Sequence, residues 1–305
     1  MKIFLFWGLL TVSYQLAVGQ TVRYFEWIHQ ADSLTKLHRY GQAAECYDSA
    51  FTQAGGQIVV HDRYNAVCVY TLTGHDEKAF QALGELAQSP RFTDSRSLLA
   101  DSDLVLLHDD PRWLPFLHAM TFKDSVAQTK INKPLKLELD SIFDSDQYYR
   151  RLVEDVHRKY GDNSPQMDSL EENMARADSQ NLVRVSAILD KYGWLGFDVV
   201  GDKGSITLWG VVQHADEHPE LQKKYLLLMR KAVADGVADK DFLAYLEDRV
   251  LVNESKPQLY GTQLVRNSQG IYEPKPIDDP AQVDIRRAAM GLEPLKYYLE
   301  ESNPK

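Results

Sequence analysis

Apolar side chains recur at helical spacing along most of this chain, and this periodicity constrains the fold more than any other feature. The clearest run begins after Ser164, with apolar residues every three or four positions up to Tyr192, and Gly193 then suits a left-handed helix cap. Polar and apolar residues alternate in one short segment, QLVRNSQGIYEP, which predicts a small β-hairpin between Thr262 and Pro274. We therefore predict a mostly α fold with one minor hairpin.

Composition limits the domain count and excludes several classes of protein. The chain has 305 residues, enough for about two domains, and its 44% hydrophobic content is too high for a disordered chain. The formal net charge is −10 and no basic run is present, which argues against nucleic acid or an anionic membrane as a partner. Two cysteines are too few for a disulfide framework.

The first 19 residues predict a secretory signal peptide. One charge at Lys2 precedes an apolar run, and small residues at Ala17 and Gly19 suit cleavage after Gly19. The alternative is an uncleaved anchor, which needs about 20 unbroken apolar residues, whereas Ser13 and Gln15 interrupt this run. We expect an exported protein, periplasmic or extracellular, whose mature chain has no membrane span.

Residues 20–130 contain a weak internal repeat of two helices joined by a short turn. Glycines in the expected turns (Gly41 and Gly74) and alanines in the second helices (Ala43 and Ala79) occupy matching positions. This pattern resembles the tetratricopeptide repeat, whose period is about 34 residues. The resemblance implies a helical-hairpin array that presents a groove for a peptide or protein partner.

The segment after the second repeat is expected to cap the array. Asp101 and Asp103 suit helix caps, and Pro111 suits the first position of a helix. Cys46 and Cys68 fall in apolar helical patterns, so they are either two buried thiols or a disulfide between neighbouring helices.

The second half is expected to form a separate helical domain over residues 135–300, after a polar linker, AQTKINKP, from Ala127 to Pro134. We expect five main helices, then the hairpin and two short helices that start near Ala281 and Pro294. The five main helices are expected at 135–160, 165–192, 206–217, 220–234 and 240–252.

Six segments of this half are distinctive in combination. They read DQYYR, YGWLGF, VVQHADEHPELQ, LEDRVL, KPQLYGTQL and DIRRAAMGLEPLKYY. The combination resembles an uncharacterised bacterial domain family of unknown function, over about Leu135 to Tyr298. The family has Pro where this chain has Leu195, which affects the rigidity of that turn. The family has no assigned activity, so the resemblance identifies a domain without supplying a mechanism.

His214 is the main candidate for chemistry, because imidazole titrates near neutral pH and His214 follows an otherwise apolar helix. It is either a general acid or base, with Asp248 as its orienting partner, or a core histidine. The segment HADEH also fits the inverted zinc-protease pattern, with His214 and His218 as ligands. Pro219 disfavours helix at His218, so we predict no metal and no cofactor.

Several polar residues are candidates for holding a polar ligand. Arg249 has the planar fork that grips a carboxylate or phosphate, although an Asp-Arg pair is more often a salt bridge or cap. The others are either ligand-binding groups or members of buried or solvated polar networks. These are Gln147, Arg150, Gln213, Gln258, Tyr260, Thr262 and Gln263, with Asp146 on the same helical turn as Gln147 and Arg150.

These observations support two hypotheses of different classes. The first is an exported helical-repeat scaffold whose carboxy-terminal domain binds a polar small molecule or a partner protein. The second is a hydrolase or transferase in which His214 is the general acid or base and Thr262 the one candidate nucleophile. The discriminating observation is whether His214 lies in a pocket that solvent reaches or is sealed within the core.

Overall fold

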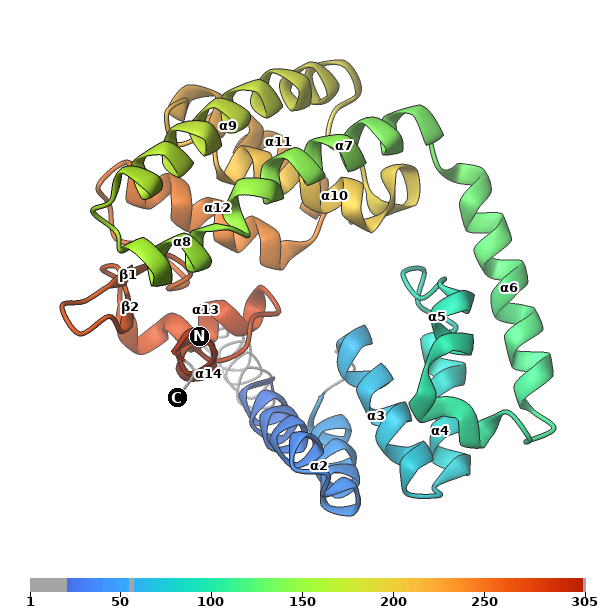
Figure 1. The fold of residues 1–305 in the computed structure, drawn as a ribbon. Coiled ribbons are helices and arrows are strands. Elements are labelled where there is room, and N and C mark those ends of the chain that lie inside the picture. Colours follow the sequence, from blue (N-terminus) through green and yellow to red (C-terminus); the bar gives the residue numbers. More distant parts are fainter. Residues whose placement is uncertain (1–20, 55–57, 304–305) are drawn as a thin grey trace, which may run out of the picture. The chain divides into compact units, whose positions relative to one another are not determined.

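The computed structural model describes residues 21–54 and 58–303, and these form helices almost throughout (Figure 1). The predicted mostly α class is confirmed, and the β structure in these ranges is one two-stranded antiparallel sheet. The predicted signal peptide, residues 1–19, lies outside the described residues. None of the described helices is long and apolar enough to span a membrane.

The chain divides into two compact units. The first contains the described residues up to Thr129 together with those from Asp284 onward, and the second is Lys130–Val283. The first unit opens with a helix over residues 21–36. Its other helices are α2 (Tyr40–Gln53), α3 (Val60–Leu72), α4 (Asp76–Leu86), α5 (Ser95–Ala100), the 3-10 helix η1 (Ser102–Leu107), α6 (Trp113–Lys130), α13 (Val283–Ala289) and α14 (Leu295–Ser302).

Small residues allow the helices of the first unit to pack closely. Ala43 and Ala79 are completely buried, in the second helix of each predicted pair. Gly74 lies in the turn between α3 and α4 with φ of 70°, a conformation that favours glycine. The prediction for Gly41 is wrong, because Gly41 is the second residue of α2. His38 takes the left-handed position instead, with φ of 57°, and its Nδ1 lies 2.7 Å from the Tyr40 hydroxyl.

The predicted linker, 127–134, contains the boundary between the two units, but most of it is helical. Helix α6 continues to Lys130 and α7 (Lys133–Arg150) begins three residues later. The Asn132 side chain accepts a hydrogen bond from the Leu135 amide and caps α7, and Pro134 lies in the first turn. Polar helix formers such as Gln and Lys therefore extend the helices here, and the break is confined to Ile131 and Asn132.

The second unit has one main helix more than predicted, because the helix expected at 135–160 is two, α7 and α8, and the helices also differ from prediction at their ends. Tyr192 ends α9 and Gly193 follows with φ of 74°, as predicted. The helix expected from Ile206 begins at Phe197 and contains a kink at Gly201. The elements are α7 (Lys133–Arg150), α8 (Val153–Tyr160), α9 (Pro165–Tyr192), α10 (Phe197–Gln213), α11 (Pro219–Ala234), α12 (Lys240–Asn253), β1 (Leu264–Arg266), β2 (Tyr272–Pro274) and the 3-10 helix η2 (Pro280–Gln282).

Helix α7 lies against both α9 and α10, and this three-helix contact carries the core of the second unit (Figure 1). Leu139 and Ile142 of α7, Val185 of α9 and Leu208 of α10 are completely buried. The hairpin pairs Leu264 with Pro274 in antiparallel register, as the alternating pattern predicts. The polar residues that follow one turn after Ile142 on α7 are thereby directed toward α10.

Two carboxyl groups of the first unit have pKa values well above their usual range. Burial raises the pKa of Asp62 to about 6, against the lowering effect of its hydrogen bond from Tyr24, and nearby Asp32 raises it further. Burial, with the charge of Glu301, raises the pKa of Glu293 to about 7. Both groups therefore bind a proton more readily in the folded chain than in the unfolded chain.

This difference predicts that the protein becomes more stable on mild acidification. Raised carboxyl pKa values destabilise the fold while the groups are ionised, so stability rises as the pH falls from about 8 toward about 5. We expect the melting temperature to rise by roughly 4 °C. The double variant Asp62→Asn with Glu293→Gln should show a much flatter profile. Thermal melts of both proteins across this pH range test the prediction. A wild-type melting temperature that decreases as the pH is lowered contradicts it.

Candidate functional site

His214 lies at the carboxyl end of α10, and its ring faces an acidic residue of α7. The His214 amide still donates to the Gly210 carbonyl, and the chain leaves helical geometry at this residue. His214 Nδ1 lies 2.9 Å from Asp146 Oδ1. The Asp146 side chain is 5% exposed and that of His214 is 25% exposed. The histidine is therefore held from behind by a buried acid while part of its ring reaches solvent.

The surroundings of Asp146 favour its ionised form. Burial alone raises the pKa of Asp146, but the hydrogen bond and charge of His214, the charge of Arg150 and the hydrogen bond from Gln147 together hold the pKa below its usual range. Gln147 donates from Nε2 to Asp146 Oδ2 over 2.8 Å. An ionised Asp146 accepts a hydrogen bond from a His214 Nδ1 that carries a proton. In the neutral ring, Nε2 is then the hydrogen-bond acceptor.

Arg150 neutralises a second acid beside this pair. Its guanidinium donates two hydrogen bonds, of 2.9 and 2.8 Å, to the carboxylate of Asp178 on α9. It also donates to the Asp146 carbonyl over 2.7 Å. Asp146, Asp178 and His214 each place one possible metal-ligand atom within 4.8 Å of the others, as a metal site requires. Because Arg150 already supplies the positive charge between the two carboxylates, these residues fit an ion-pair network better than a metal centre.

A pocket of about 330 Å³ opens beside His214 between α7 and α10. One side is apolar and aromatic, and the other carries the acid, amide, guanidinium and imidazole groups. Trp209 is held from behind by stacking on Phe242, with ring centroids 4.5 Å apart. The lining residues are Phe143, Asp146, Gln147, Arg150, Ile206, Thr207, Trp209, Gly210 and His214. The predicted residues Gln147, Arg150 and His214 therefore share one pocket.

Asp248, predicted to orient His214, lies in a different network. It is completely buried on α12, and its oxygens accept hydrogen bonds from the amides of Leu259, Tyr260 and Thr262 and from the Thr262 hydroxyl. The four donors fix the loop that leads into the hairpin. The carboxylate that contacts His214 belongs to Asp146 instead.

The two glutamines of the same loop are bound to the chain itself. Gln258 is completely buried, donates to the carbonyls of Gln263 and Lys275, and accepts from the Gln263 amide. Gln263 accepts from Arg249 over 3.0 Å and donates to the Thr262 hydroxyl. These bonds give Gln258 and Gln263 a clear structural role, that of holding the hairpin against α12.

We expect Gln263→Ala to lower the free energy of unfolding by about 2 kcal/mol, because the change removes the hydrogen bonds of a 6% exposed side chain to Arg249, Thr262 and the Tyr245 carbonyl. Gln269→Ala, at an exposed position in the hairpin loop, is the matched control and should change stability by less than about 0.5 kcal/mol. Urea unfolding of the two variants gives the comparison. Equal stability of both would show that the Gln263 side chain is dispensable to the fold.

Arg249 binds a carboxylate, as its fork suits, but the carboxylate is the chain's own Asp216. Arg249 Nε donates to Asp216 over 2.9 Å, and a second guanidinium nitrogen contacts the other oxygen. Asn253 also donates to Asp216, over 2.8 Å. Tyr260 donates to Glu247 over 2.9 Å. Gln213 is 7% exposed, and its Oε1 accepts no hydrogen bond within the described part of the chain.

The zinc-protease reading of HADEH finds no support in the geometry. His218 is exposed and precedes α11, which begins at Pro219, so His214 and His218 do not lie on one helix. His214 instead faces Asp146, which is 68 residues away in sequence. Asp178, Phe143 and Trp209 also lie around His214, but no local sequence pattern marks them as site residues, because they come from separate turns and helices.

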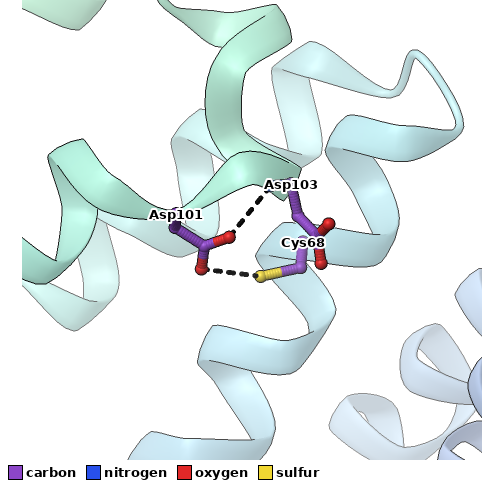
Figure 2. Close-up of side chains that lie close together, drawn as sticks. All are labelled: Cys68, Asp101 and Asp103. Carbon is purple, nitrogen blue, oxygen red and sulfur yellow. Dashed lines mark hydrogen bonds between the residues drawn. The ribbon is translucent and has the colours of Figure 1, made fainter.

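A second cluster of possible metal-binding side chains lies in the first unit (Figure 2). The Cys68 thiol contacts Asp101, and Asp103 lies beside them. Asp101 caps η1 by accepting from the Asp103 amide over 2.9 Å, and it also accepts from the Tyr64 hydroxyl. Burial and the two carboxylates raise the pKa of the Cys68 thiol. The hydrogen bonds give the cluster a structural role, and Cys46 and Cys68 are both free thiols.

The second unit is thus a helical domain with a histidine-aspartate pair in a pocket. A family of unknown function, DUF6624, matches residues 133–303, and the chain belongs to that family. The predicted relationship to a domain of unknown function is confirmed over this range. The relationship of the first unit to tetratricopeptide repeats stays a prediction. No curated protein and no solved structure matches the chain.

Proposed function

We propose that the carboxy-terminal domain is a hydrolase or transferase in which His214 is the general base and then the general acid. The observation that carries this proposal is the contact of 2.9 Å between His214 Nδ1 and the buried Asp146, beside a pocket that His214 lines. A histidine sealed in the core would support the first hypothesis, a binding scaffold. A histidine that is 25% exposed and is backed by an acid supports the second.

Each group in the pair has a defined part in the proton transfer. His214 Nε2 takes a proton from a hydroxyl group or a water molecule in the pocket, so that the oxygen attacks an electrophilic centre of the substrate. Asp146 stabilises the imidazolium that forms and keeps the ring in position. The same proton then passes from Nε2 to the leaving group, which returns His214 to its neutral form.

Activity screening with matched histidine variants tests this proposal. The mature chain is assayed on a panel of chromogenic esters, phosphate esters and glycosides, in parallel with His214→Ala and His218→Ala. We expect at least one substrate to be turned over by wild type and His218→Ala but about 100-fold more slowly by His214→Ala. Equal rates in all three proteins, or no turnover of any substrate, count against the proposal.

A groove of about 500 Å³ supports a second role for the first unit, that of binding an extended peptide with both acidic and basic side chains. Two ion pairs line it, Lys78 with Asp48 at 2.5 Å and Arg63 with Glu85. The acidic and basic side chains of a peptide can replace the partners within these two ion pairs. Pull-down with the mature chain and with its Lys78→Glu variant tests this role. Recovery of the same proteins by both would show that the groove is not the binding site.

Export is also part of the proposal, and it rests on the sequence of residues 1–19. Expression of the full chain followed by mass spectrometry of the secreted fraction tests it. We expect a mature protein that begins at Gln20. Recovery of the uncleaved chain from the cytoplasm contradicts export.

A further inference from the structure

We infer that the ligand of the His214 pocket is a neutral, hydroxyl-bearing ring of about monosaccharide size. This inference rests on the proposed function and names its substrate class. It follows from three properties of the pocket: the balance of its charges, the hydrogen-bonding groups left open to a ligand, and the nature and size of its walls.

Each charged group of the pocket already has a partner within the chain. Arg150 pairs with Asp178 through two hydrogen bonds and lies 3.4 Å from Asp146, which also contacts His214. An anionic ligand would have to compete with Asp178 for Arg150. A cationic ligand would compete with Arg150 for the carboxylates. Because a partly buried charge without a partner is costly, the pocket favours a neutral ligand.

The open hydrogen-bonding groups of the pocket include two acceptors and one donor, since Trp209 lines the pocket and its buried Nε1 has no partner within the described part of the chain. His214 Nδ1 is engaged by Asp146, and among the described residues the ring makes no other hydrogen bond, so Nε2 is left open. Gln147 is oriented through its Nε2 donor to Asp146, so its Oε1 is left to accept. Two acceptors placed together call for ligand groups that donate, and His214 in its proton-accepting form calls for a hydroxyl. A hydroxyl-bearing ligand satisfies both.

The walls and the volume favour a single ring. Phe143, Ile206 and Trp209 form the apolar side of the pocket, and aromatic side chains pack well against the C–H faces of a saturated ring. At about 330 Å³, the pocket is at the small end of the range of roughly 300–1,000 Å³ that ligand sites span. These features together fit the apolar faces and polar edge of a sugar or cyclic polyol.

A matched set of ligands that differ in charge tests the inference. Neutral hexoses and myo-inositol, the cation glucosamine and the anion glucose 6-phosphate are titrated into the mature chain up to about 10 mM, in the range of weak binding, by ligand-observed NMR. We expect at least one neutral ring to bind about tenfold more tightly than both charged analogues. Gln147→Leu should abolish this binding, whereas Gln180→Leu, at an exposed position on α9, should leave it unchanged.

The outcomes separate this inference from the proposed function. Tighter binding of a charged analogue, or no binding of any neutral ring, overturns the ligand class. Binding of a neutral ring that Gln147→Leu leaves intact also overturns it, because the ligand then lies elsewhere. The role of His214 is judged separately, by the turnover of His214→Ala. Neutral-ring binding in a protein without His214-dependent turnover supports the ligand class and contradicts the proposed chemistry.

Discussion

Replacement of Asp248 by alanine should lower the free energy of unfolding of the second unit by about 5 kcal/mol. The change removes a completely buried carboxylate that accepts three amide hydrogen bonds and one hydroxyl hydrogen bond. Each buried donor left without an acceptor costs about 1–3 kcal/mol. We therefore expect the hairpin to lose its attachment to α12.

Urea unfolding monitored by hydrogen exchange of the Leu259, Tyr260 and Thr262 amides measures this effect. Asp235→Ala is the matched control, because Asp235 is 51% exposed and pairs with Lys231 within one helical turn. That change should be nearly neutral. A loss below about 1.5 kcal/mol for Asp248→Ala would show that the four donors find other acceptors.

Asp146→Asn should reduce the turnover of any His214-dependent substrate by about 100-fold, with a smaller effect on KM. The carboxylate is expected to fix the tautomer of His214 and to stabilise the imidazolium, whereas an amide carries no charge and its NH2 group can hold the ring in the other tautomer. Asp146 is a positioning residue, since it acts through His214. The loss should therefore appear mainly in kcat, and the pH dependence of kcat should change, which a merely structural role would not produce.

The control for this prediction lies on the same helix. Asp144 is 68% exposed and pairs with Lys203. Asp144→Asn therefore removes the same charge from the same helix as Asp146→Asn does, but it leaves the pocket intact. We expect its kcat to remain within about twofold of wild type. Steady-state kinetics from about pH 5 to pH 9 would separate the variants. An unchanged pH profile in Asp146→Asn, or an equal loss in both variants, would exclude the positioning role.

The elements of the second unit illustrate how far local sequence patterns reach. The stripe that begins after Ser164 predicts α9, and Gly193 marks its end, because a helix and its cap are set by residues three or four positions apart. The hairpin is likewise predicted from alternation and from a glycine in its loop. At 127–134 the sequence pattern does not show the secondary structure, because polar helix formers also suit a linker, and the capping of α7 by Asn132 decides where that helix begins.

The candidate site was predicted in its residue types but not in its pairing. His214, Gln147 and Arg150 were expected to be functional, and they line one pocket. Asp248 was expected beside His214 because it is an acid in a distinctive segment of the same half. The spacing of acids along the chain does not tell which one contacts a given histidine, because that contact depends on how the helices pack.

The sequence by itself therefore determined the helical class, the hairpin, the family and the candidate histidine, since each depends on neighbouring residues or on a recognisable segment. Only the tertiary structure decided that His214 contacts Asp146, 68 residues away, and that Arg150 contacts Asp178 on another helix. It also decided that the side chains of Asp248 and Gln258 are hydrogen-bonded to the loop that leads into the hairpin. The physical reason is that helix packing brings distant turns together, and periodicity shows which face is buried but not what that face contacts.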